Sequence, residues 1–124
     1  MKTTPIAFIN QAVISTLCLE CMNGEPIYLG ESNIEHMKQK HPADYEKYHP
    51  YINDILSSPD YVGINSTDNS LEFVKEILTD KKFVKIAVRV SLSGKYFARS
   101  LYVLNPNRVR NFIAKGTLKK LTNN

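Results

Sequence analysis

FVKIAVRVSL (83–92) and KYFARSLYVL (95–104), joined by Ser93-Gly94, form the stretch that decides the fold of this chain. Both runs alternate apolar and polar residues, which is typical of strands with one buried face, and Ser93-Gly94 predicts an antiparallel hairpin with a two-residue loop. The expected cross-strand pairs on the core face are Val90 with Phe97, Ile86 with Leu101, and Val84 with Val103. A slip of one residue would turn the apolar side chains of one strand away from the core, so the hydrophobic pattern selects this register.

The same register predicts a polar face on the other side of the hairpin. The pairs expected there are Lys85 with Tyr102, Ala87 with Ser100, and Arg89 with Ala98. Arg99 is the exception, because the register places it on the apolar face opposite Val88, where its stem could cover the core while the guanidinium reaches water. A hydroxyl and a phenol beside cations can move protons at a phosphodiester and stabilise its developing charge. The alternative is a set of ordinary residues on a half-buried strand face.

Charge is distributed unevenly along the 124 residues, whose formal net charge is +4. Residues 1–80 hold all 12 acidic residues and 5 lysines, which gives a net charge of −7. Residues 81–124 hold the other 11 of the 16 basic residues and no acidic residue, which gives +11. A segment without carboxylates to neutralise it indicates a surface for a polyanion, although a solvated basic edge would have the same composition.

Length and composition predict one domain over residues 1–124 with a modest core. No apolar run is long enough to cross a bilayer, so no membrane partner is expected. Cys18 and Cys21 are too few for a disulfide framework and indicate a reducing, cytoplasmic environment. Polar residues interrupt the apolar region before Met22, which argues against a secretory signal peptide.

Helical signals dominate the chain before residue 60. The expected elements are a helix at 11–21 capped by Asn10, a strand at 27–29, a helix at 33–41 opened by the capping box of Ser32 and Glu35, and a helix at 43–57 that starts after Pro42 and that Pro50 could split. Strand signals follow at 61–65 and 71–78, although the second segment also suits a helix.

The segment after the hairpin predicts a short helix to about residue 115, opened by Asn105-Pro106 and ended by Gly116. The basic tail at 116–124 is expected to fray. Helices followed by antiparallel strands predict an α+β fold, with the N-terminal helices packed on one face of an antiparallel sheet of about four or five strands.

Two of the three histidines, His36 and His41, fall on the helix expected at 33–41. Helical geometry places His41 with the apolar stripe of this helix and His36 beside Lys40 on another side. Either histidine could act as a general acid or base near neutral pH. The structural alternatives are a hydrogen-bonded histidine at a helix C-terminus for His41 and plain surface for His36.

A zinc site is a further possibility, because Cys18, Cys21, His36 and His41 approach the spacing of a two-Cys, two-His site. The segment between the cysteines and the histidines contains a Gly-x-Pro turn and a capping box, and it lacks the aromatic and leucine spacing of a zinc finger. The sequence therefore favours a chain without metal or other cofactor.

Three segments, HMKQKHP (36–42), NDILSSPDYVG (53–63) and AVRVSLSGKYFARSLYVLNP (87–106), resemble the phage-associated branch of the barnase/EndoU/colicin/RelE-like ribonuclease fold. The resemblance extends over about residues 27–115, which it identifies as a nuclease-like core. It matches His36 and His41 to the histidines of a His-apolar-x-x-basic-His-Pro motif. It also matches Ser100 and Tyr102 to a late-strand hydroxyl and aromatic residue, with serine where threonine is expected.

The resemblance implies a metal-independent endoribonuclease of the toxin or phage-effector type, in which the 2′-OH of RNA attacks its own phosphate and leaves a cyclic phosphate. The candidate catalytic residues are His36, His41, Ser100, Tyr102 and Arg89, and the candidate substrate-binding residues are Lys85, Lys40 and Arg99. RNA is the expected partner, and a protein inhibitor is a second possible one. The alternatives are a nucleic-acid-binding domain without catalysis on the same fold and a zinc-stabilised interaction module.

Overall fold

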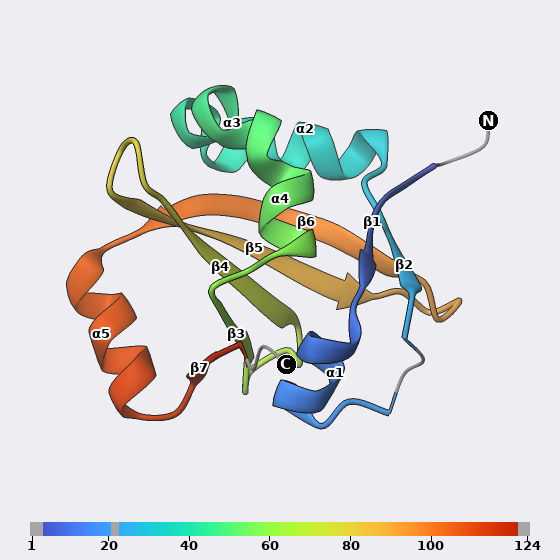
Figure 1. Ribbon diagram of the computed structural model, residues 1–124. Coiled ribbons are helices and arrows are strands. Elements are labelled where there is room, and N and C mark those ends of the chain that lie inside the picture. Colours follow the sequence, from blue (N-terminus) through green and yellow to red (C-terminus); the bar gives the residue numbers. More distant parts are fainter. Residues whose placement is uncertain (1–3, 21–22, 122–124) are drawn as a thin grey trace.

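The computed structural model describes residues 4–20 and 23–121, which fold into a sheet with helices on both sides (Figure 1). Its elements, in chain order, are β1 (Pro5–Ile9), α1 (Gln11–Leu17), β2 (Glu25–Tyr28), α2 (Glu31–Lys40), α3 (Pro42–Tyr48), the 3-10 turn η1 (His49–Tyr51), α4 (Ile52–Ser57), β3 (Tyr61–Ile64), β4 (Leu71–Ile77), β5 (Lys82–Val90), β6 (Tyr96–Leu104), α5 (Pro106–Ala114) and β7 (Leu118–Lys120). None of the helices in the described part of the chain is both long and apolar enough to cross a membrane.

The sheet has the strand order β1-β2-β6-β5-β4-β3-β7. The α+β class is as predicted, but the sheet has seven strands rather than four or five. It is also mixed, because β2 runs parallel to β6 while the other neighbours are antiparallel. The additional strands are β1, which the sequence shows only as a short apolar run, and β7.

Apolar clusters form on both faces of the sheet, because successive strand residues point to opposite sides. The larger cluster contains Phe73, Ile86 and Leu101 of the sheet, and α1 to α4 all contribute buried residues to it. The smaller cluster contains Val74 and Leu104 of the sheet, Val109 of α5 and Leu118 of β7. Figure 1 shows α2, α3 and α4 grouped above the sheet and α5 below it. The face that α5 covers in part is the polar face of the hairpin.

The central hairpin keeps the predicted register over most of its length. The pairs Val84 with Val103, Lys85 with Tyr102, Ile86 with Leu101 and Ala87 with Ser100 are confirmed. Beyond Ala87 a β-bulge leaves Arg99 unpaired, so that Val88 lies opposite Ala98 and Arg89 lies opposite Phe97. The predicted positions of Arg99 opposite Val88, of Arg89 opposite Ala98 and of Val90 opposite Phe97 are therefore wrong, and Val90 lies opposite Tyr96.

The bulge has a clear physical reason, because it places the fully buried Ala98 rather than a charged residue beside Val88 in the core. It also lengthens the connection between the strands. The strands end at Val90 and Tyr96, and the predicted two-residue loop is wrong, because Ser91 donates its N–H to the carbonyl of Lys95 across a longer turn. Gly94 lies in this turn with φ +85, a conformation that favours glycine.

The helical half follows the sequence with two corrections, and it settles one alternative that the sequence left open. Asn10 caps α1 as predicted, accepting from the N–H of Val13 at 2.9 Å, but the helix ends at Leu17 rather than near residue 21. The predicted capping box at Ser32 is wrong, because Gly30 is the N-cap and the Asn33 side chain accepts from its N–H at 2.9 Å. Pro50 does split the second helix, and α3 and α4 flank the 3-10 turn that contains it.

The C-terminal segment, predicted to fray over residues 116–124, is ordered as far as it is described, and residues 122–124 lie outside the described residues. Leu118–Lys120 does not fray but forms β7, which pairs with β3, and Leu118 is buried in the smaller cluster. Gly63 of β3 allows this approach, because a Cβ at that position would overlap the carbonyl oxygen of Thr117. The segment 71–78, which also suited a helix, forms β4 because Leu71, Phe73 and Ile77 point into the larger cluster.

Candidate functional site

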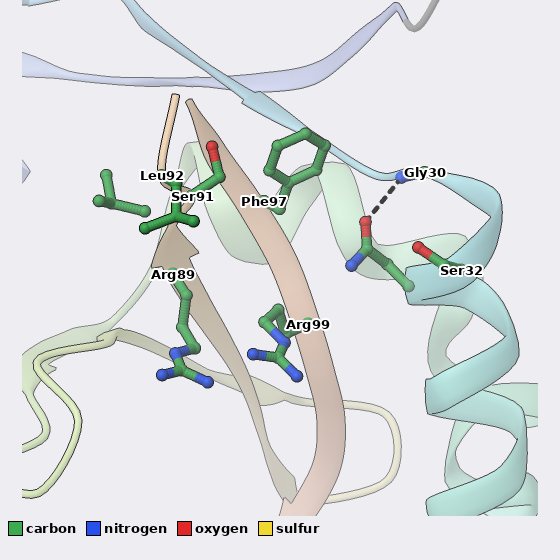
Figure 2. A pocket seen from close by; sticks show the side chains of 9 residues that line it. Gly30, Ser32, Arg89, Ser91, Leu92, Phe97 and Arg99 are labelled. Atoms are coloured by element: carbon green, nitrogen blue, oxygen red, sulfur yellow. Dashed lines mark hydrogen bonds between the residues drawn. The ribbon is translucent and has the colours of Figure 1, made fainter. Parts of the chain in front are cut away.

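Two cavities hollow the polar face of the hairpin. The larger, about 470 Å³, lies at the hairpin end and is lined by Arg89, Phe97 and Arg99 together with the start of α2 (Figure 2). The smaller, about 330 Å³, lies near α5 and is lined by residues that include Lys85 and Tyr102. Between the two cavities, Ala87 and Ser100 face each other across the strands. The face that the sequence singled out is therefore a recessed surface between α2 and α5.

Tyr102 brings together two other candidate residues on this surface. The imidazole of His41 is stacked on its ring, with 4.8 Å between ring centroids and 27° between the planes. The Nζ of Lys85 lies 4.9 Å from the centroid of the same ring. A phenol thus contacts an imidazole and an ammonium group, which are both groups that can take part in proton transfer.

The position of His41 depends on the turn between α2 and α3. His41 is the residue between these helices, and Pro42 begins α3, so the chain changes direction at the histidine. Asp44, in the first turn of α3, accepts from the backbone N–H of Val103 with its Oδ2 at 3.0 Å. This bond ties α3 to β6 next to Tyr102, and it holds the exposed His41 against the phenol.

Lys85, predicted to bind substrate, is an ion-paired residue of the sheet interior. Its Nζ donates to Oε2 of Glu72 at 2.7 Å, and the two side chains are only 9% and 6% exposed. Burial by itself lowers the pKa of Lys85, but its hydrogen bonds with Glu72 and Tyr102 outweigh burial and raise the pKa above its ordinary value. Lys85 therefore stays protonated and supplies a fixed positive charge beneath Tyr102.

Glu72 is a site residue that the sequence reasoning missed. It lies on β4 with its side chain in the smaller cavity, and it also accepts from Nδ2 of Asn65 at 3.4 Å. The sequence could have indicated this residue, because Glu72 lies between the buried Leu71 and Phe73 and strand alternation places its carboxylate on the polar face. Its pairing with Lys85 follows from the neighbouring positions of β4 and β5 in the sheet.

Arg89 and Arg99 form the basic part of the larger cavity. Figure 2 shows their side chains extending from neighbouring strands in the same direction. The bulge thus gives Arg99 a place beside Arg89 instead of the predicted core position. Asp68, in the β3–β4 loop, lies near Arg89: hydrogen bonds from the backbone and hydroxyl of Ser70 lower the pKa of Asp68, and the charge of Arg89 lowers it further.

The other candidate residues lie at the margins of this surface. Ser100 is half-buried on β6, His36 is half-buried within α2, and Lys40 is exposed at the end of α2. Among the residues that the structure describes, His36 and Lys40 make no hydrogen bond, ion pair or ring contact with the other candidate residues. The structure therefore groups His41 with Tyr102 and Lys85, and Arg89 with Arg99, while His36 and Lys40 stand apart.

The zinc alternative requires Cys18, Cys21, His36 and His41 to come together. Cys21 lies outside the described residues, and Cys18 is exposed at the end of α1. Within residues 4–20 and 23–121, no group of three or more His, Cys, Asp and Glu side chains could hold a metal ion.

Comparison with known proteins gives one match. A family model described as phage-Barnase-EndoU-ColicinE5/D-RelE like nuclease 3 matches residues 5–111. The match includes His36 within α2, His41 directly after it, the whole hairpin and most of α5. It begins at β1 rather than at the expected residue 27. No curated protein and no solved structure shows a significant match.

Proposed function

Because the chain belongs to the phage-Barnase-EndoU-ColicinE5/D-RelE like nuclease family, whose members act on nucleic acid, we propose that it is an endoribonuclease that needs no metal ion. The observation that carries this proposal is the contact of His41 with Tyr102 above the charge of Lys85. This contact places an imidazole, which can transfer a proton, at the recessed surface between α2 and α5, called the recess below. The proposal includes cytoplasmic action as a toxin or phage-derived effector. A protein inhibitor is also proposed, because an unrestrained ribonuclease harms the cell that makes it.

The proposed reaction requires two proton transfers and charge stabilisation. A neutral imidazole takes the proton of a ribose 2′-OH as the 2′-oxygen forms a bond to the adjacent phosphorus. The bond from phosphorus to the 5′-oxygen breaks, and this oxygen takes a proton from a general acid. The products are a 2′,3′-cyclic phosphate and a 5′-hydroxyl end. Arginine side chains stabilise the charge that develops on the phosphate oxygens.

The residues of the recess suit these roles to different degrees. His41 is exposed and held on Tyr102, so we assign it one of the two proton transfers. His36, which stands apart in the structure, is the candidate for the other on the strength of the sequence motif alone. Arg89 and Arg99 are the phosphate-binding residues of the proposal, because they line an open cavity. Lys85 acts through Tyr102, since its own charge is paired with Glu72.

Binding without cleavage is the second candidate function, and the pairing of Lys85 with Glu72 favours it. A buried ion pair removes one of the two hairpin cations that were expected to hold phosphate. The basic face would then serve to attach the chain to RNA, with the histidines in structural roles.

The test of the proposed function is the cleavage of single-stranded RNA in an excess of chelator. The expected products carry 2′,3′-cyclic phosphate ends, and DNA of the same sequence stays intact because it lacks the attacking 2′-OH. An RNA with a single 2′-deoxy substitution is the matched control, since only cleavage at that position should stop. RNA that is bound but left intact would favour the binding function, and cleavage that chelator abolishes would indicate a metal-dependent reaction.

Charge reversal in the larger cavity is expected to weaken RNA binding more than charge reversal on β7. The variant Arg89→Glu/Arg99→Glu should bind single-stranded RNA far more weakly than wild type, and the dependence of its affinity on salt should be less steep, by roughly one counterion for each lost phosphate contact. The variant Lys119→Glu/Lys120→Glu is the control, because it changes the same charge on β7, at the opposite edge of the sheet from β1 and β2. Titrations at several salt concentrations measure both quantities. Equal losses in the two variants would mean that the recess has no special role.

A further inference from the structure

The larger cavity has an aromatic wall as well as a basic part. Figure 2 shows the Phe97 ring between Ser91 of the hairpin and Gly30 of the segment that leads into α2. Val90 and Leu92 add apolar side chains, both of which are exposed. At about 470 Å³ the cavity falls within the usual range of small-ligand sites, roughly 300–1,000 Å³.

Phe97 is fixed in position by its neighbours. It pairs with Tyr28 across β2 and β6, and the two rings are tilted by 40° with 5.7 Å between their centroids. Lys95 places its Nζ 5.6 Å from the centroid of the Tyr28 ring. An aromatic ring that is already held by the fold loses little conformational freedom when it binds a ligand.

The pairing of an aromatic ring with two arginines indicates the chemistry of the ligand. A phosphate alone would use Arg89 and Arg99 but not Phe97, and an apolar peptide would use Phe97 but leave two guanidinium groups without anions. A nucleotide uses both, because its base stacks on a ring and its phosphate binds guanidinium groups.

We propose that the larger cavity binds one unstacked base of single-stranded RNA on the ring of Phe97, with the phosphates on either side of that base held by Arg89 and Arg99. This site rests on the proposed function and names its substrate class. Because of the bulge, Phe97 and Tyr102 lie opposite Arg89 and Lys85, which are four strand steps apart, or roughly 13 Å. The base on Phe97 therefore belongs to the nucleotide next to the phosphate that is cleaved, and this phosphate is one of the two that the arginines hold. Duplex RNA is a poor ligand for this site, because a base must leave its stack to enter.

Replacing Phe97 with leucine tests the base site while keeping an apolar side chain in the strand. Binding of a labelled single-stranded 2′-O-methyl RNA, which cannot undergo the proposed attack, should weaken by about 5- to 150-fold, the range that follows from the loss of one stacked base. Phe97→Tyr keeps the ring and should bind as wild type does. Phe8→Leu is the matched control, because Phe8 is 54% exposed on β1 and does not line the cavity. Duplex RNA of the same sequence should bind wild type and Phe97→Leu equally.

The outcomes separate this site from the proposed function. If wild type cleaves RNA and Phe97→Leu binds the single strand as tightly as wild type, the base site is wrong and the proposed function stands. An equal loss of affinity for single strand and duplex also contradicts the base site, because it shows a general loss of phosphate binding or of structure. If wild type neither binds nor cleaves RNA, both proposals are wrong.

Discussion

Replacing His41 with alanine is expected to lower the rate of RNA cleavage by about 10²- to 10⁴-fold, the usual cost of removing a positioned general acid or base. The side chain is exposed, and its main contact is the stack on Tyr102, so the fold should survive. Affinity for RNA should change little, since the arginines remain. Single-turnover cleavage with saturating enzyme measures the chemical step separately from binding.

His49 offers a matched control for this experiment. It is also an exposed histidine stacked on a tyrosine, with 5.0 Å between its ring centroid and that of Tyr45. It lies in η1, and its partner Tyr45 lines neither cavity, whereas Tyr102 lines the smaller one. His49→Ala should therefore cleave RNA at the wild-type rate. His36→Ala should be as slow as His41→Ala if it supplies the second proton transfer. Undiminished cleavage by both the His36 and the His41 variants would show that the active site lies elsewhere.

Replacing Glu72 with glutamine is expected to lower the free energy of unfolding by about 3–5 kcal/mol, because it leaves the ammonium group of Lys85 buried without its counter-charge. Both side chains are more than nine-tenths buried, so water cannot take the place of the lost carboxylate. Denaturant titration near neutral pH measures the change. The pairing raises the pKa of Lys85, so its contribution is complete below the unfolded-state pKa of about 10.4 and is lost as the pH rises through the folded-state value.

Two further variants test whether burial is the cause. Lys47→Met removes a cation whose side chain is 60% exposed and which lies 3.5 Å from Asp80, so it should cost at most about 1 kcal/mol. The double variant Glu72→Gln/Lys85→Met removes both charges and should recover much of the stability that Glu72→Gln loses. If Glu72→Gln were as stable as wild type, Lys85 would have another source of compensation.

The hairpin shows how far alternation alone can predict a sheet. Alternation gives the correct pairs from Val84 to Ala87, because it assigns both residues of each pair to the same face of the sheet. It fails at Arg99, where the sequence offers two physical solutions: a snorkelling arginine on the core face or a bulge that removes it from that face. Alternation cannot choose between them, since the choice depends on the space beside Val88, which Ala98 fills.

The candidate site was predictable in its residue types and only partly in its contacts. The motif indicated His41 and Tyr102, but their stacking depends on the turn at Pro42 and on the bond from Val103 to Asp44. Glu72 and Lys85 are 13 residues apart, and only the pairing of β4 with β5 brings them together. Likewise β7 is too short to show a period, and it depends on the space left by the absent side chain of Gly63.

The bond between Asp44 and Val103 also has a consequence for solubility. Strand β2 pairs with β6 only at Tyr96 and Phe97, so the rest of that edge of a central strand would be open to a strand of another molecule. The Asp44 carboxylate accepts the hydrogen bond of the Val103 amide, and α2 and α3 pack along β6 (Figure 1). The turn that positions His41 therefore also covers a sheet edge that would otherwise be exposed. Changes that loosen it would cost the chain its resistance to aggregation as well as its alignment for catalysis.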